Sequence, residues 1–177
     1  TTSMTTKEAM LHDWGSRDQK FIDLNHSIRE SLVKLIDGEN NYQCVPMQGS
    51  GTFAVESMVG SLTSKDAKIL ILINGAYGHS MKKMCDYVGR ECIAYEVAEH
   101  EQHDLGEIEN IIDSNTDLTH VFAVYCETTS GILNPIQKIS DLVAKKNLSL
   151  FIDAMSAFGA LPLSSKTIAF DAVAASS

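Results

Sequence analysis

The residues Ile69-Leu70-Ile71-Leu72-Ile73 form an unbroken apolar run, and this run constrains the fold of the 177-residue chain more than any other segment. It shows no alternation of polar and apolar residues, and it ends at Asn74-Gly75. A strand that is apolar on both faces belongs inside a parallel sheet covered by helices, whereas a membrane span would need about 20 apolar residues. The run therefore predicts an α/β protein with a mostly parallel sheet.

Helical and strand patterns alternate along the rest of the chain. Apolar residues recur every three or four positions in the predicted helices, and the predicted strands are short apolar runs. We expect helices over 18–37, 53–62, 77–88 and 105–112 and one that starts at Asn134-Pro135, and strands over 42–47, 69–73, 92–95, 121–126, 148–152 and 169–175. The Asn134 side chain is expected to cap its helix. This order predicts one doubly wound α/β domain over residues 1–177, with helices on both faces of the sheet.

Charge and cysteine content narrow the function classes. Fourteen basic against 23 acidic residues give a net charge of −9, which disfavours a nucleic-acid partner and leaves anion binding to local backbone groups. The polar N-terminus has no signal-peptide pattern and no run is long enough for a membrane span, so we expect a cytoplasmic protein. The four cysteines form no C-x-x-C pair, and His100 and His103 lack a clear third ligand, so no metal site is predicted.

The segment Gly49-Ser50-Gly51-Thr52 has the composition of a phosphate-binding turn. Glycines let backbone amides approach a ligand closely, and a helix that starts there directs its N-terminal N–H groups and positive dipole end at the same point. The residues also fit the dinucleotide pattern G-x-G-x-x-A, but the acidic residue expected about 20 positions later is Asn74 instead. A phosphate cradle, a dinucleotide site and a turn that binds nothing all remain open at this point.

Three more side chains follow predicted strands, at the edge where open α/β sheets bind ligands. Tyr77 could stack on a flat ring, and Thr128 belongs to a cluster of hydroxyl-bearing residues that could donate to a ring substituent. Asp153 ends a buried strand, and an isolated buried carboxylate is costly unless a cation meets it. A protonated pyridine nitrogen is such a cation, and its protonation makes the ring an electron sink. Together with the phosphate cradle, these residues indicate pyridoxal phosphate.

Taken in order, these segments resemble the class V aminotransferases of the fold type I pyridoxal-phosphate enzymes, over essentially the whole chain. The segments are 49–52, 74–78, 127–131 and 153–156. Within the class, residues 13–16 and the wording of the motifs are most similar to the transaminases of 2-aminoethylphosphonate and pyruvate, with alanine–glyoxylate and serine–pyruvate aminotransferases as near relatives. The resemblance implies the large domain of that fold, an amino donor and a 2-oxo acid as substrates, and a homodimer.

The resemblance also assigns roles to individual residues. Ser50, Gly51 and Thr52 would hold the cofactor phosphate, Tyr77 would stack on the ring, Thr128 would hydrogen-bond near the ring hydroxyl, and Asp153 would pair with the pyridine nitrogen. Each role agrees with the chemistry of the residue that carries it.

The family further requires a lysine that forms a Schiff base with the cofactor and shuttles a proton. Lys166 lies too close to Asp153 and before the last predicted strand, so the resemblance places this lysine just beyond Ser177 and no catalytic residue within the chain. The C-terminal small domain, with the arginine that binds the substrate carboxylate, is also expected outside the 177 residues. The resemblance thus implies a truncated large domain that is inactive by itself. A Rossmann-type nucleotide-binding domain and an inactive scaffold of the same fold remain as alternatives.

Overall fold

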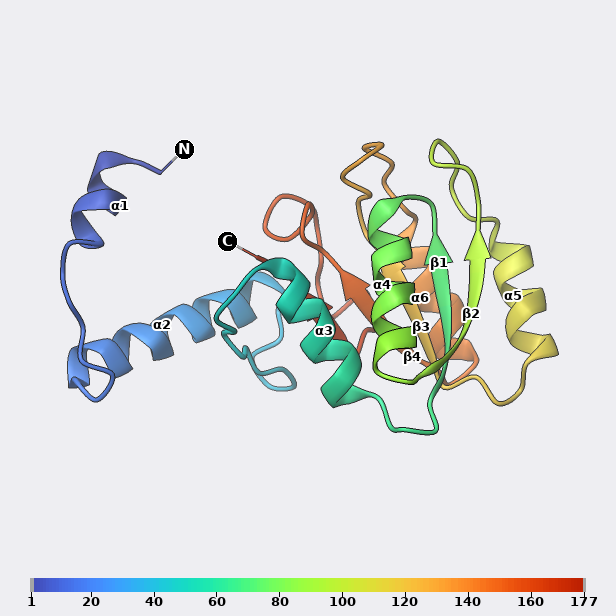
Figure 1. The fold of residues 1–177 in the computed structure, drawn as a ribbon, viewed down its shortest axis with the longest axis horizontal. Coiled ribbons are helices and arrows are strands. Elements are labelled where there is room, and N and C mark those ends of the chain that lie inside the picture. The colour runs from blue at the N-terminus through green and yellow to red at the C-terminus, as the bar shows by residue number, and fades with distance from the viewer. Residues whose placement is uncertain (1, 177) are drawn as a thin grey trace. The chain divides into compact units, whose positions relative to one another are not determined.

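The computed structural model describes residues 2–176 (Figure 1). The chain divides into two compact units, one up to Pro46 and one from Met47 onward. A single domain over residues 1–177 stays a prediction.

The unit up to Pro46 contains two helices, α1 (Met4–Ala9) and α2 (Gln19–Leu35). Ser3 caps α1, because its hydroxyl accepts a hydrogen bond from the Thr6 amide at 3.2 Å. The predicted amphipathic helix corresponds to α2, although none of its residues is buried.

The segment 42–47 forms no strand, so the strand predicted there is wrong. The Arg29 side chain of α2 donates from Nε to the Cys44 carbonyl at 2.8 Å, and Pro46 has no N–H to give to a ladder. The apolar pattern of this short run does not reveal that the Cys44 carbonyl accepts a hydrogen bond from a side chain and not from a neighbouring strand.

The unit from Met47 onward is built on a five-stranded sheet in the order β2-β1-β3-β4-β5, with every pair parallel. Ile69 to Ile73 are each at most 1% exposed, because β1 has a strand on either side and helices on both faces. The predicted mostly parallel sheet is therefore confirmed. The strands are β1 (Lys68–Ile73), β2 (Glu91–Glu96), β3 (His120–Val124), β4 (Ser149–Asp153) and β5 (Ala172–Ala174).

Helices cover both faces of this sheet, as predicted (Figure 1). They are α3 (Gly51–Leu62), α4 (Ala76–Tyr87), α5 (Leu105–Ser114) and α6 (Ile136–Lys145). α3 and α4 bury apolar side chains against Ile69, Ile71 and Ile73 on one face, while α5 and α6 pack together on the other. Because α4 follows β1 and α6 follows β3, the chain leaves these adjacent strands toward opposite faces. Open α/β sheets bind ligands at such a switch point.

Asn134 does not cap α6, so that expectation is wrong. Pro135 holds the N-cap position, with no side-chain hydrogen bond to the helix. Asn134 Nδ2 donates instead to the Val124 carbonyl (2.9 Å) and to Asn74 Oδ1 (3.1 Å), and Asn74 Nδ2 donates back to Asn134 Oδ1 (2.9 Å). Both side chains are buried. This reciprocal amide pair joins the chain after β1 to the chain after β3 at the switch point.

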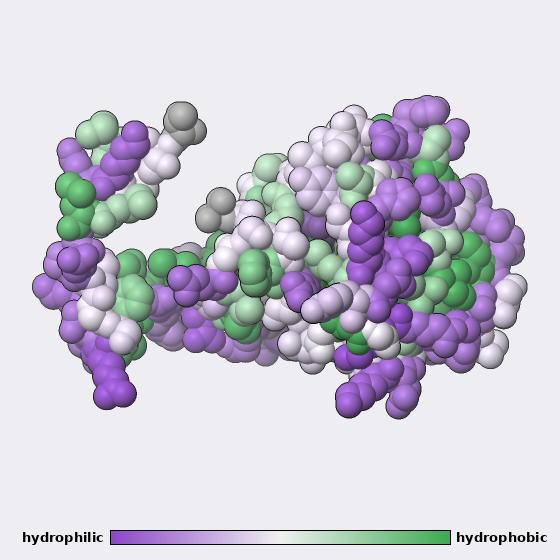
Figure 2. All heavy atoms as spheres, viewed as in Figure 1, coloured by the Kyte–Doolittle hydropathy of each residue, from purple (hydrophilic) through white to green (hydrophobic). Residues whose placement is uncertain are grey.

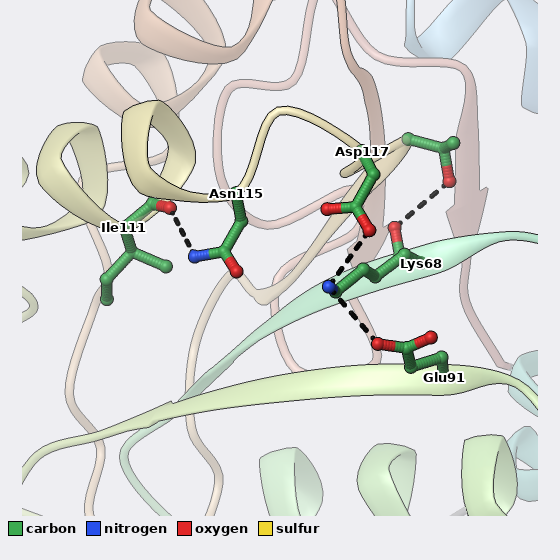
Figure 3. A network of polar contacts seen from close by, with 6 residues as sticks. Lys68, Glu91, Ile111, Asn115 and Asp117 are labelled. Carbon is green, nitrogen blue, oxygen red and sulfur yellow. Dashed lines mark hydrogen bonds and ion pairs between the residues drawn. The ribbon is translucent and has the colours of Figure 1, made fainter.

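The amino-terminal ends of β1 and β2 carry a network of charged contacts (Figure 3). Lys68 Nζ lies 3.0 Å from Asp117 Oδ2 and 3.1 Å from Glu91 Oε1, and these two carboxylates raise the pKa of the lysine. Asn115 Nδ2 donates to the Ile111 carbonyl at 2.8 Å, at the end of α5. These contacts join β1, β2 and the α5–β3 connection at the edge away from the carboxyl ends of the strands.

Hydrophilic side chains cover the outer side of α4 in the space-filling view (Figure 2). Lys82 Nζ lies 2.8 Å from Asp86 Oδ2 on that helix. Within residues 2–176, no helix is long and apolar enough to cross a membrane.

Candidate cofactor site

A cavity of about 730 Å³ opens at the carboxyl ends of the strands, and Gly51, Thr52, Tyr77 and Asp153 line it. Four of the six predicted cofactor-binding residues therefore surround one space, although they come from α3, α4 and β4. The fifth, Ser50, directly precedes Gly51.

The Gly49–Thr52 turn presents the start of α3 to this cavity. Gly49 has a φ of +136°, which favours glycine, and Ser50 holds the N-cap position with extended backbone and no side-chain cap hydrogen bond. In the first turn of α3 the Phe53 N–H donates to the Ser50 carbonyl at 2.9 Å, while the N–H groups before it have no partner within the helix and are available to an anion. A Cβ at Gly51 would come within 2.6 Å of Met155 Sδ, so the methionine side chain would have to shift to admit one.

Asp153 lies at the end of β4 and is 3% exposed. Its Oδ1 accepts a hydrogen bond from the Met155 amide at 3.0 Å. Burial raises the pKa of this carboxyl; the Met155 amide opposes that shift, and the nearby Glu127 carboxylate adds to it. A cation that approached Asp153 from the cavity would favour the ionised form.

Tyr77 lines the cavity, and Thr128 does not. Tyr77 is the second residue of α4 and is 39% exposed, so its ring faces space that a ligand could fill. The Thr128 and Ser156 hydroxyls share a short hydrogen bond, which links the loop after β3 to the loop after β4. Neither Thr128 nor Ser156 lines the cavity, although Ser156 directly follows the lining residue Met155.

Two residues near the site were assigned no role from the sequence. Glu127 is fully buried, and the signal that could have revealed it is the one used for Asp153, a carboxylate directly after a buried apolar run. Lys83 of α4 also lines the cavity. Its neighbours in the sequence resemble an ordinary solvated helix face, so no local pattern distinguished it.

His103 is buried instead of serving as a surface ligand. Its ring packs edge-on against Tyr95, with centroids 5.2 Å apart, and burial outweighs the nearby carbonyls of Ile73 and Tyr95 to lower its pKa. Among residues 2–176, no group of three or more His, Cys, Asp or Glu side chains is arranged to hold a metal ion.

The residues around the cavity fit an aromatic phosphate with a basic ring nitrogen. Backbone donors at the start of α3 suit the phosphate, the Tyr77 ring suits a flat ligand, and the buried Asp153 carboxylate suits a protonated nitrogen. Pyridoxal phosphate combines these three features. The lysine expected just beyond Ser177 lies outside the described residues.

The sequence model of the class-V aminotransferases matches residues 5–177. The chain belongs to the class-V aminotransferase family. Proteins named 2-aminoethylphosphonate–pyruvate transaminase are 45% identical to it in Pseudomonas fluorescens and Pseudomonas putida, and 41% identical in Pseudomonas aeruginosa. Each match covers all 177 residues but 48% of the relative, so this class-V aminotransferase chain spans about half the length of the curated relatives.

Solved structures of aminotransferases share the fold of this class-V chain. An alanine–glyoxylate aminotransferase from Nostoc sp. superposes with a TM-score of 0.87 at 21% identity, over 95% of this chain and 45% of that one. An aspartate aminotransferase from Thermus thermophilus gives 0.88 at 15% identity, over 98% and 49%. At such low identity the likeness concerns the fold alone.

Proposed function

We propose that the protein containing this chain uses pyridoxal phosphate to transfer the amino group of 2-aminoethylphosphonate to pyruvate, giving phosphonoacetaldehyde and alanine. The observation that carries the proposal is the 45% sequence identity to transaminases named for these two substrates, over an alignment that covers the whole chain. We further propose that the protein is a homodimer, as the family resemblance implies, and that it is cytoplasmic, as expected from its sequence pattern.

The chain's own residues would bind and orient the cofactor. Ser50, Gly51 and Thr52 would hold its phosphate with donors at the start of α3, and the helix dipole would favour the negative charge. Tyr77 would stack on the ring and keep water from one face. Thr128 would donate to the ring hydroxyl, while its own hydroxyl is oriented by Ser156.

Asp153 would keep a proton on the ring nitrogen, because a buried carboxylate is stabilised by a cation next to it. When bound, the cofactor supplies an electron sink for the carbon that loses its proton. The family resemblance places the lysine that would take up and return this carbon's proton, as a general base, just beyond Ser177.

The test is substrate preference in the full-length protein loaded with pyridoxal phosphate. We expect alanine to form from pyruvate at least about tenfold faster with 2-aminoethylphosphonate than with serine at equal concentration. Faster reaction with serine, or with alanine and glyoxylate, would reassign the substrates to the near relatives. Thermal stabilisation by NAD, with none by pyridoxal phosphate, would contradict the cofactor as well.

A further inference from the structure

Glu127 is a buried charged residue for which the proposed reaction has no use. Its side chain is fully buried, and Oε1 accepts a hydrogen bond from the Thr129 hydroxyl at 3.0 Å. Oε2 has no hydrogen-bond partner among residues 2–176. Burial of a carboxylate oxygen without a donor costs free energy, so this placement is unfavourable unless the side chain does something else.

The Glu127 side chain lies directly against Gly75. A Cβ at Gly75 would come within 2.4 Å of Glu127 Cγ and Cδ and within 2.8 Å of Oε2. The φ of Gly75 is 164°, an extended conformation that any residue adopts. The backbone therefore does not require glycine at this position; the Glu127 side chain does.

This contact connects the two parts of the site that carry Tyr77 and Thr128. Gly75 is the N-cap residue of α4 and lies two positions before Tyr77, while Thr128 directly follows Glu127. β1 and β3 are adjacent, and α4 and α6 leave them toward opposite faces of the sheet. The contact thus joins two chain segments at the switch point, and the dipole of the 12-residue α4 favours an anion at this end.

We propose that Glu127 is a positioning residue of the cofactor site, whose side chain packs on Gly75 and anchors the turn to Thr129, and so fixes Tyr77 relative to Thr128. The inference rests on the proposed function, because those two residues matter only if they contact the cofactor. The charge of Glu127 has an additional effect, since it raises the pKa of Asp153.

The test is the affinity of the full-length protein for pyridoxal phosphate, measured by fluorescence quenching without substrates. Glu127→Gln keeps the size of the side chain and an acceptor for Thr129, so we expect affinity within about threefold of wild type. Glu127→Ala removes the contact and Gly75→Ala creates an overlap, and each should weaken binding by about tenfold or more. Glu109→Ala, on the exposed face of α5, is the control and should bind as wild type.

The double variant isolates the contact. Once Glu127→Ala is present, the overlap is gone, so adding Gly75→Ala should cost less than about twofold in affinity. Losses that multiply in the double variant would overturn the proposal, as would wild-type affinity in Glu127→Ala. If Glu127→Ala does not fold, wild-type affinity in Gly75→Ala overturns it equally.

A pH profile separates positioning from general stability. Glu127→Gln removes a negative charge near Asp153, so the acid limb of cofactor affinity should move to lower pH. An unchanged limb would contradict this effect of the Glu127 charge on Asp153, whereas the affinities of the alanine variants test the packing contact. If the wild-type protein binds no pyridoxal phosphate, the proposed function fails. The Gly75–Glu127 contact is then still tested by the unfolding free energies of wild type, Glu127→Ala, Gly75→Ala and the double variant.

Discussion

The buried Asp153 carboxylate destabilises the folded protein when it is ionised, but it can stabilise a cation bound in the cavity. Its folded pKa is raised, so above the unfolded value of about 3.9 its ionised form destabilises the empty protein. A cation in the cavity offsets that cost, because it stabilises the charge that burial penalises. Under the proposed function, the same burial would favour a protonated ring nitrogen as the partner of Asp153.

Asp153→Asn is expected to weaken binding of pyridoxal phosphate by about 10–100-fold, because a hydrogen bond to a charged group contributes about 1.5–3 kcal/mol. The empty variant should melt no lower than wild type, since asparagine carries no charge to bury. Fluorescence titration and thermal unfolding of the full-length protein measure the two effects. Asp86→Asn, on the exposed side of α4, is the control. Equal affinity in Asp153→Asn and wild type would contradict the assignment of Asp153.

Residues whose partners are distant in the sequence were the ones that sequence reasoning misjudged. Asn134 has the local context of a helix cap, but its side chain pairs with Asn74, which lies beyond two intervening helices. Glu127 has a local context of hydroxyl-bearing neighbours, and its defining contact with Gly75 is equally remote. Asp153 was assigned a cationic partner from its position alone, because an unpaired charge after a buried strand is costly in any fold.

At the scale of elements, the prediction succeeded where the apolar pattern alone determines the environment. The run from Ile69 to Ile73 is apolar at every position, and both of its faces are covered in the structure. The segment 42–47 is short and contains Pro46, so its apolar residues did not determine whether a strand would pair with it. A long run that is apolar throughout indicates that both of its faces are buried. Whether a short run forms a strand depends on neighbouring strands that the sequence does not locate.

The packing of α4 on β1 depends on Gly78. A Cβ there would come within 2.9 Å of the Ile73 Cα, a backbone atom that cannot move aside cheaply. Gly78→Ala should therefore lower the free energy of unfolding by about 1–3 kcal/mol, the usual range for overpacking. Urea denaturation of the full-length protein measures the change.

Gly60 in α3 is the matched control for Gly78. It also lies within a helix, but a Cβ there would meet nothing within 4 Å. Gly60→Ala should raise the free energy of unfolding by about 0.4–1 kcal/mol, because it reduces the freedom of the unfolded chain. Equal effects of the two substitutions would show that helix–strand contact is not what requires glycine at 78.

At the scale of the whole molecule, the chain spans about half the length of the curated transaminases that it matches. The share covered is 48% of each of these relatives, and the family resemblance places the catalytic lysine outside the 177 residues. The 177 residues expressed alone should therefore form no alanine from 2-aminoethylphosphonate and pyruvate, and should bind pyridoxal phosphate only weakly. Parallel assays of the 177-residue and full-length proteins measure this, and comparable turnover in both would refute it.

Acid should destabilise the molecule partly through His103. Burial lowers its folded pKa below the unfolded value of about 6.5, so the unfolded chain takes up the proton first as pH falls. The contribution of His103 to the free energy of unfolding is fully present above about pH 6.5. Below that pH it is lost by up to about 1.4 kcal/mol per pH unit, until the folded pKa is reached. His120, whose pKa burial also lowers, contributes in the same direction.

His103→Gln should flatten this acid slope, because glutamine does not titrate. Unfolding free energies between pH 7.5 and about 5 measure it. An unchanged slope in His103→Gln would place the acid sensitivity elsewhere.

The cavity is assembled from residues of α3, α4 and β4, which meet only when the sheet has formed in its final strand order. An unfolded chain, in which those residues are scattered, has no such cavity to offer. A ligand that recognises it therefore reports on completed folding and shifts the equilibrium toward the native state by about 2.7 kcal/mol at a hundred times its dissociation constant. A cofactor that binds this cavity would therefore raise the folded fraction of the protein, and its concentration in the cell would influence how much protein escapes degradation.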